Sequence, residues 1–450
     1  MEPPAEGLTV VTESPTLKLR LGAIAHGGHT VARHEGRVIF VRHGIPGELV
    51  TVRLTDSDEN AKFWRADVVE VHEASEHRVP HFWEAADALR HRDPVGGAEF
   101  GHITLEHQRE LKAGVAAEQL TRLGGMKAED YNFPAVQAVA GQDDGLGWRT
   151  RMSYSVDAEG KLAMSGFRSN TLTAIDSMPL AHPAIERTGL YTMDFSGIER
   201  VEAAVSSSDD STVLILLAES RPGAARKAAR QFPEGVNVAA FSQQGGSAAD
   251  GRGELQALTG RSWLQESVLG ESFRITGEGF WQVHRAAATV LSERVMELTE
   301  PARGEQIADL YAGAGLFSLP LAKAVGPEGR VFSIEGAPGT HADAKKNLRE
   351  LRQASVIRGR VERVLRQVAR DAQLDAVVLD PPRAGIDKQV AAELGSSGVS
   401  RICYVSCDPA SFARDTARLT SRGYELAHME IHDLYPHTHH MESIGLFVRR

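Results

Sequence analysis

The chain has 450 residues and two cysteines, Cys403 and Cys407, both in the segment RICYVSCDP. Residues 401–406 read as an apolar strand with side chains on alternating faces, so Cys403 in its middle is most simply a small core residue. Cys407 follows the strand, and Asp408 and Pro409 are residue types that begin a helix. Because the positive end of a helix dipole lowers a thiol pKa, we expect Cys407 to be a nucleophilic thiolate. The alternative is a second inert, buried cysteine.

A glycine-containing turn is the second feature that suggests chemistry. DLYAGAGLFSLPLA, residues 309–322, reads as a strand, a turn with Gly313 and Gly315, and a helix beginning near Leu316. Glycines let the backbone approach a ligand, and the helix offers unpaired N–H groups. The next strand ends in Glu335, 20 residues after Gly315, where an acidic residue commonly binds ribose hydroxyls. The pattern is not GxGxxG and lacks a phosphate-loop lysine, so it favours a nucleoside-type cofactor. A turn without a ligand is the alternative.

Two carboxylates complete the candidate site. Asp380, in LDPPRAG, falls at the carboxyl end of a predicted strand, where open α/β sheets bind ligands. Arg383 stands where enzymes that methylate exocyclic amines carry an aromatic residue, which disfavours that reaction. Glu442, in PHTHHMES, precedes the terminal strand. Histidines crowd this stretch, but no carboxylate or cysteine pattern accompanies them, and we predict no metal site. They are His432, His437, His439 and His440.

A thiolate and a methyl-donor fold together point to one reaction class. Uracil C5 is a poor nucleophile, but a thiolate that adds at C6 turns C5 into an enolate-like carbon able to attack a sulfonium methyl group. A general base must then remove the C5 proton so that the thiolate can leave. In this scheme Cys407 is the nucleophile, and Glu442 is the acidic candidate for the base.

Four stretches of chain must position these residues, and together they predict a multidomain α/β protein. Residues 1–15 are rich in Pro and Glu and are expected to be disordered. Residues 16–78 predict four or five strands in a small closed β-barrel of the oligonucleotide-binding kind. Residues 79–268 predict a central α+β domain whose helix, at about 104–124, we expect to pack on the catalytic domain. Residues 269–450 alternate strand and helix, which predicts a doubly wound α/β domain.

Composition narrows the class of protein. The chain is 42% hydrophobic and 24% charged, as ordinary soluble proteins are. A net charge of −10 argues against a general polyanion-binding coat, although a local basic face remains possible. No run approaches the length of a membrane span and no signal peptide is evident, so we expect a cytoplasmic monomer without a membrane partner. Basic residues of the predicted barrel favour a nucleic-acid partner over a generic β-domain: Arg20, Arg37, Arg42, Lys62 and Arg65.

These motifs resemble the RNA uracil-C5 methyltransferase family, which uses S-adenosylmethionine to make 5-methyluridine in tRNA or ribosomal RNA. FWQVH, DLYAGAG, FSIEG, DPPRAG, VSCDP and PHTHHMES match its catalytic motifs in order, and WRTRMSYSV with GFRS is similar to its central-domain signature. Residues 16–78 look like its TRAM domain. The resemblance implies a Rossmann-like methyltransferase domain with Cys407 as nucleophile and Glu442 as base. It also implies a set of residues that contact or shape the cofactor site: Gln282, Tyr311, Gly313, Gly315, Glu335 and Asp380.

The chain departs from the family pattern at several positions. Many members bind an iron–sulfur cluster through four cysteines, and the matching positions here hold other residues, so we expect no cluster. They are Val79, Val95, Ala98 and Met178. In the FWQVH motif, His284 stands where an Asn is usual, and Leu316 replaces a residue that is often polar. Both departures bear on cofactor affinity.

Two other functions remain open. A cytosine-C5 RNA methyltransferase often carries a second cysteine in the DPP-like motif, and this chain has none at 380–383. A non-catalytic RNA-binding protein would not need the intact Cys407 and Glu442. The sequence does not identify the target uridine. Ribosomal RNA is slightly favoured over tRNA because some tRNA-acting members lack the N-terminal barrel.

Overall fold

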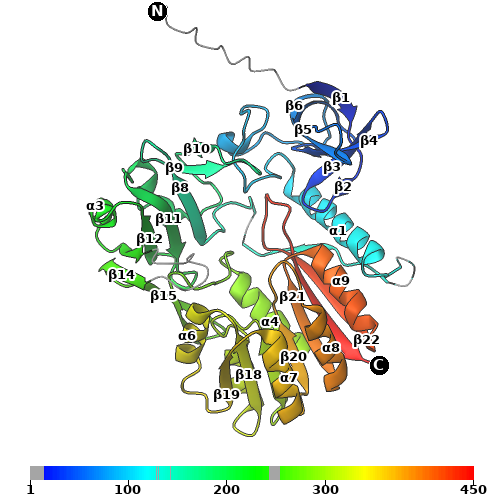
Figure 1. Cartoon of the computed structure of the whole chain (residues 1–450), viewed down its shortest axis with the longest axis vertical. Coiled ribbons are helices and arrows are strands. Elements are labelled where there is room, and N and C mark those ends of the chain that lie inside the picture. The colour runs from blue at the N-terminus through cyan, green and yellow to red at the C-terminus, as the bar shows by residue number, and fades with distance from the viewer. Residues whose placement is uncertain (1–14, 128, 130, 142, 243–253) are drawn as a thin grey trace, which may run out of the picture.

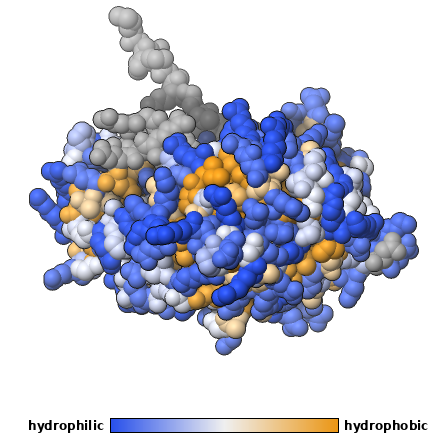
Figure 2. Space-filling view, turned by 90° about the horizontal axis from the view of Figure 1, so that it is seen from below, coloured by the Kyte–Doolittle hydropathy of each residue, from blue (hydrophilic) through white to orange (hydrophobic). Residues whose placement is uncertain are grey.

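The computed structural model describes residues 15–127, 129, 131–141, 143–242 and 254–450. The tail expected to be disordered, 1–15, lies outside this part of the chain except for Pro15. Figure 1 shows an N-terminal sheet and a central sheet above a large sheet that carries the C-terminal half. Within the described residues, no helix is long and apolar enough to cross a membrane. On the face in Figure 2, hydrophilic residues predominate and hydrophobic ones form a few separate areas.

The N-terminal sheet has six strands where the pattern predicts four or five. Their order is β1-β5-β6-β4-β3-β2. The edge strands β1 and β2 belong to one continuous stretch, and Gly22 between them donates its N–H to the Val31 carbonyl on β3 at 2.8 Å. The sheet thereby curls around a small apolar core. The strands are β1 (Thr16–Arg20), β2 (Ile24–Ala25), β3 (His29–His34), β4 (Arg37–Arg42), β5 (Leu49–Asp56) and β6 (Phe63–Glu73).

The central sheet has seven strands in the order β10-β9-β8-β11-β12-β13-β14. Short helices pack on it, and a two-stranded hairpin follows, with the predicted domain boundary at 268/269 in its turn. The elements are η1 (Glu84–Ala86), β8 (Arg151–Val156), β9 (Leu162–Ser165), β10 (Leu172–Ala174), α2 (Pro183–Glu186), η2 (Leu190–Thr192), β11 (Ile198–Val205), β12 (Val213–Glu219), α3 (Ala224–Ala229), β13 (Asn237–Ser242), β14 (Glu254–Thr259), β15 (Trp263–Val268) and β16 (Glu271–Thr276).

The largest sheet has eight strands in the order β19-β18-β17-β20-β21-β23-β22-β7. The inner strands β17, β18, β20 and β21 are mostly buried, the edge strands β19 and β7 are less so, and β23 is antiparallel to its neighbours β21 and β22. Helices separate successive strands from β17 to β22, as the pattern predicts, and a loop joins β22 to β23. The elements are β7 (Val136–Ala138), α4 (Ala287–Thr299), β17 (Gln306–Leu310), α5 (Ser318–Val325), β18 (Arg330–Glu335), α6 (Pro338–Asn347), β19 (Ala354–Arg358), α7 (Val361–Asp371), β20 (Ala376–Leu379), α8 (Lys388–Ser397), β21 (Arg401–Ser406), α9 (Pro409–Thr420), β22 (Tyr424–Asp433) and β23 (Glu442–Arg449).

This strand order places the candidate residues at one edge of the sheet. The order reverses between β17 and β20, and open α/β sheets bind ligands outside the carboxyl ends of strands at such a point. Tyr311, Asp380 and Cys407 each directly follow a strand that ends there. Glu442 begins the antiparallel β23, whose first residue therefore lies at the same edge.

Helix α1 (Leu105–Arg122), which corresponds to the helix expected at 104–124, packs on the large sheet beside α9. Its buried Lys112 donates to Asp433 at the end of β22 over 2.6 Å, although the two residues are 321 positions apart. Gln108, one turn earlier, accepts from the backbone N–H of His437 at 2.8 Å. Through these bonds α1 fixes the loop 434–441, drawn in red between β22 and β23 in Figure 1.

Candidate active site

Cys407 is half-buried between β21 and α9. The helix begins as the sequence predicts, since Asp408 caps it by accepting from Ser411 N–H at 2.7 Å and Pro409 is its first residue. The expectation of a thiolate is wrong for the protein as it stands. Burial, with the nearby carboxylates Glu442 and Asp380, raises the pKa of Cys407 to about 12. Burial and the two carboxylates therefore raise the thiol pKa by more than the helix dipole lowers it.

Glu442 is fully buried at the start of β23. The Tyr435 hydroxyl donates a hydrogen bond to its Oε2 at 2.9 Å. Burial first, and then the charge of Asp380, raise the pKa of Glu442 well above its usual range, while the bond from Tyr435 lowers it. A carboxyl with a raised pKa suits proton transfer near neutral pH.

Asp380 follows β20 at the point where the strand order reverses. Gln282 donates from Nε2 to its Oδ2 at 3.3 Å. Burial raises the pKa of Asp380 to about 7, and the bond from Gln282 opposes this shift. A carboxylate with this pKa can exchange a proton under physiological conditions.

Glu335 ends β18 and faces the glycine turn after β17. Its two oxygens accept from backbone N–H groups, Oε2 from Gly313 at 2.8 Å and Oε1 from Ala337 at 2.6 Å. Tyr311 and Gly313 both have positive φ, 61° and 56°, so the backbone turns sharply as it leaves the strand. After this turn α5 begins at Ser318, two residues beyond Leu316, near which the sequence predicts the helix to start.

A cavity of about 770 Å³ brings these residues together. Its walls include seven of the eight site residues that the sequence predicts: Gln282, Tyr311, Gly313, Glu335, Asp380, Cys407 and Glu442. The eighth, Gly315, lies in the turn with φ of 91°, a backbone conformation that residues with a side chain rarely adopt. Its part is to shape the backbone, because no residue with a side chain fits there easily.

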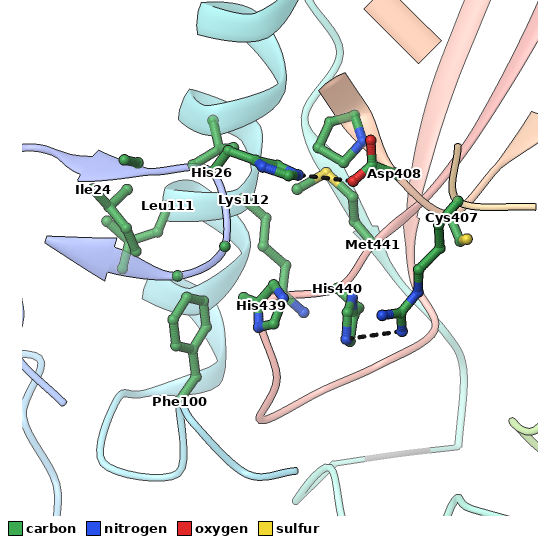
Figure 3. A pocket seen from close by; sticks show the side chains of 16 residues that line it. Ile24, His26, Phe100, Leu111, Lys112, Cys407, Asp408, His439, His440 and Met441 are labelled. Atoms are coloured by element: carbon green, nitrogen blue, oxygen red, sulfur yellow. Dashed lines mark hydrogen bonds and ion pairs between the residues drawn. The ribbon is translucent and has the colours of Figure 1, made fainter. Parts of the chain in front are cut away.

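A second, smaller cavity reaches Cys407 from the other side (Figure 3). It lies between the β2–β3 turn, α1 and the loop 434–441, and both cavities share Arg383, Cys407 and His440. Arg383 lies 3.3 Å from His440 Nε2. The thiol is therefore accessible both from the side of Glu335 and from the side of the N-terminal sheet.

Of the four histidines near Glu442, His439 and His440 lie beside each other with ring centroids 4.0 Å apart, and the others have contacts of their own. His432 lies 3.2 Å from Glu430, His437 contacts Gln108 and the Asp144 carbonyl, and His439 lies 3.8 Å from Glu99. In the part of the chain that the structure describes, no three His, Cys, Asp or Glu side chains are grouped to hold a metal ion.

The departures from the family pattern have structural explanations. Val95, Ala98 and Met178 are all buried in one apolar cluster of the central domain, so these side chains fill the region that the resemblance assigns to a metal cluster. His284 is buried against Trp148 with ring centroids 5.6 Å apart. Leu316 packs in the apolar core below the large sheet. Neither His284 nor Leu316 lines the cavity.

Several cavity residues give no signal in the sequence. Gln282 and Tyr311 are found through the resemblance alone, because a lone Gln or Tyr suggests no chemistry. Tyr435 directly precedes the PHTHHMES motif around Glu442, but its spacing does not distinguish it from a core aromatic. Further cavity residues come from the central domain and the segment after β16, far in sequence from Cys407: Arg149, Arg151, Glu202, Glu278 and Phe280.

Comparisons with known proteins agree with this geometry. Residues 270–450 match the family model described as tRNA (uracil-5-)-methyltransferase. An uncharacterized RNA methyltransferase of Streptomyces avermitilis is 36% identical over 435 residues, which are 95% of this chain and 97% of the relative. One of Bifidobacterium longum is 36% identical over 444 residues, 96% of each chain.

The solved structures include a match over nearly the whole chain. The Pyrococcus abyssi tRNA (uracil-54, C5)-methyltransferase, solved with S-adenosyl-L-homocysteine, has a TM-score of 0.71 at 20% identity, covering 95% of this chain and 99% of that one. This likeness shows that the two proteins share a fold. With relatives of 36% identity over nearly the whole chain and the family match of residues 270–450, the chain belongs to the RNA (uracil-C5-)-methyltransferase family.

Proposed function

We propose that this protein transfers a methyl group from S-adenosylmethionine to C5 of a uridine in RNA, through a covalent bond between Cys407 and C6 of the uracil ring. The observation that carries the proposal is that Cys407, Glu442 and Asp380 line one cavity with Gln282 and Glu335. A thiol nucleophile, a buried base and an acidic residue placed for ribose hydroxyls are the groups this reaction needs.

The residues present fit S-adenosylmethionine. Gly313 presents bare backbone to the cavity, and Glu335 is held there by two N–H groups. Arg151 Nη2 and Glu278 Oε2 are buried in the same wall without a hydrogen-bond partner among the described residues. A ligand with a carboxylate and an ammonium group would satisfy both atoms. When bound, the cofactor supplies an electrophilic methyl group on a sulfonium.

Cys407 begins the reaction. Since its thiol is protonated at neutral pH, the proton must leave as the sulfur–C6 bond forms. Asp380, a cavity carboxylate with a pKa of about 7, is suited to accept it. The electron pair of the C5–C6 double bond then moves toward C5 and O4, and C5 becomes the carbon that accepts the methyl group.

Glu442 completes the reaction. Its carboxylate removes the proton from the methylated C5, the C5–C6 double bond forms again, and the bond from C6 to Cys407 breaks with its electrons returning to sulfur. The enzyme needs Glu442 ionised at this step, although burial favours the neutral form. The cavity must therefore contain a group that stabilises the carboxylate.

For the substrate we propose ribosomal RNA, with residues 16–78 acting as a TRAM domain that contacts it. The support is the small curled sheet with its basic residues. The P. abyssi tRNA enzyme matches 95% of this chain, a share that extends into the N-terminal sheet, so the sheet alone does not exclude tRNA.

The test is methyl transfer from labelled S-adenosylmethionine, with mass mapping of both RNAs from a strain that lacks the gene. We expect one or more 5-methyluridines to disappear from ribosomal RNA and to return with the wild-type gene but not with Cys407→Ala. Label in 5-methylcytidine would instead identify a cytosine-C5 enzyme. RNA binding without any label would identify a non-catalytic RNA-binding protein.

A further inference from the structure

Tyr435 connects the base of the reaction to the helix α1. Its hydroxyl donates to Glu442 at 2.9 Å, and its backbone carbonyl accepts from Lys112 Nζ at 3.0 Å and from Thr438 Oγ1 at 2.8 Å. Lys112 is buried in α1 and is itself fixed by its ion pair with Asp433. The backbone of Tyr435 is thus held by Lys112 and Thr438 while its hydroxyl bonds Glu442.

Packing of the ring leaves the hydroxyl little freedom. The Tyr435 ring meets Trp148 edge-on with centroids 6.1 Å apart, and meets His440 edge-on at 6.0 Å. Trp148 is fully buried in the core of the central domain. The central domain, α1 and the large sheet therefore all help to aim one hydroxyl at Glu442.

We propose that Tyr435 is a positioning residue for the base: its hydroxyl holds the Glu442 carboxylate in the cavity and favours the ionised form that removes the C5 proton. The inference rests on the proposed function and adds the group that prepares its base. Nothing in the motif around Glu442 or in the comparisons assigns this role to Tyr435.

The charges around Glu442 show why a donor is needed. The titratable and charged groups that share its cavity or lie opposite it in β22 are Arg149, Arg151, Glu202, Glu278, Tyr311, Glu335, Asp380, Arg383, Cys407, His432, Tyr435 and His440. Burial and Asp380 both favour the neutral carboxyl, and the Tyr435 bond is the side-chain hydrogen bond to Glu442 among the described residues. Burial also raises the pKa of Tyr435 well above its usual value, so the hydroxyl stays protonated and remains a donor.

The variant that tests the proposal is Tyr435→Phe, which keeps the ring and removes the hydroxyl. Its matched control is Tyr404→Phe. Tyr404 is fully buried, more so than the partly buried Tyr435, and it also donates to a carboxylate, that of Asp415, at 2.8 Å; neither Tyr404 nor Asp415 lines the cavity. Both variants lose one buried hydroxyl–carboxylate bond, so a general loss of stability affects both.

With RNA, the readouts are the pH profile of turnover and the amount of covalent protein–RNA adduct. Loss of a hydrogen bond to a charged group should raise the pKa of Glu442 by about one unit. At pH values below the wild-type pKa, the turnover of Tyr435→Phe should therefore be about tenfold lower than that of wild type. Turnover should recover toward wild type as the pH rises, and the adduct should accumulate at low pH. A uniform loss at every pH, without adduct, would overturn the proposal.

Without RNA, the rate of Cys407 alkylation by iodoacetamide, followed on its peptide by mass spectrometry, reports the charge on Glu442. Because anionic Glu442 disfavours the thiolate, Tyr435→Phe should alkylate severalfold faster than wild type near neutral pH. The change should vanish when Glu442→Gln is present in both proteins. If Tyr435→Phe changes the alkylation rate equally with Glu442 and with Gln at position 442, the inference is wrong. Absence of methylation by the wild-type protein would overturn only the proposed function.

Discussion

His26 of the N-terminal sheet lies 2.8 Å from Asp408, the residue that follows Cys407 and caps α9. The two residues are 382 positions apart, so this contact is one way in which the N-terminal sheet is fixed against the nucleophile. Figure 3 shows the pair at the rim of the smaller cavity, beside Cys407 and Met441. Gly28, two residues after His26, approaches His439 so closely that an added Cβ would lie 2.8 Å from the His439 Cβ.

We expect His26→Ala to weaken RNA binding more than catalysis. An exposed pair of this kind contributes about 0.2–1 kcal/mol, so the KM for RNA should rise about 1.4- to fivefold with kcat little changed. The control is His72→Ala, because His72 bonds Thr51 within the same sheet and does not reach the active site. Steady-state kinetics with methyl-labelled cofactor measures both constants. A fall in kcat with unchanged KM would contradict this view of the contact.

Purified protein should be colourless and free of stoichiometric iron and zinc. The positions that the resemblance assigns to cluster ligands hold Val79, Val95, Ala98 and Met178, and none of these side chains offers a thiolate. The measurements are the visible absorption spectrum and a metal assay on protein prepared without oxygen. About one cluster per chain would contradict the prediction.

Part of this site follows from the sequence, because strand ends in an α/β sheet meet at one edge. Asp380, Cys407 and Glu335 are recognisable by that rule together with their residue types. The pKa of the Cys407 thiol cannot be predicted in this way, since it depends on Glu442 and Asp380, which approach Cys407 only in the folded chain. A local argument from the helix dipole therefore gives the wrong direction.

The difference between local sequence patterns and contacts that form only in the folded chain also applies to the rest of the fold and site. Strand and helix periodicity predicts the large sheet, whose inner strands are mostly buried apolar runs. It does not predict the sixth strand of the N-terminal sheet, because β2 has only two residues. Nor does it identify Tyr435, whose position depends on Lys112 in a helix more than 300 residues earlier in the chain.

The pH dependence of Cys407 alkylation tests its environment. A folded pKa of about 12, above the ordinary value of about 8.5, means that the neutral thiol is favoured and that stability from this group is lost as pH rises between the two values. The alkylation rate of the free enzyme should therefore keep increasing up to about pH 10. A plateau near pH 7 would show instead that the helix dipole dominates.

Cys407→Ala should abolish methyl transfer and leave S-adenosylmethionine binding nearly unchanged, because the thiol acts on the base of the RNA. Cys403→Ala is the control. Cys403 is buried in the middle of β21 within an apolar cluster, and its loss should reduce stability by about 1 kcal/mol while activity persists. Isothermal titration and a methyl-transfer assay separate the two effects. Equal loss of activity in both variants would contradict the assignment.

Glu442→Gln keeps the shape of the side chain and removes its basicity. If Cys407 has added to C6 and C5 has been methylated, the adduct leaves only when the C5 proton is removed. The variant should therefore accumulate a covalent protein–RNA species, visible as a slow band on a denaturing gel.

That band should carry label from the methyl group of S-adenosylmethionine and should be absent from the double variant with Cys407→Ala. His440 is the rival base, because it lines the cavity, whereas His432, His437 and His439 do not. Burial lowers the pKa of His440 to about 3, so it is neutral at pH 7 and chemically able to accept a proton. The decisive comparison is with His440→Gln: if that variant traps the adduct while Glu442→Gln turns over normally, the base is His440 and not Glu442.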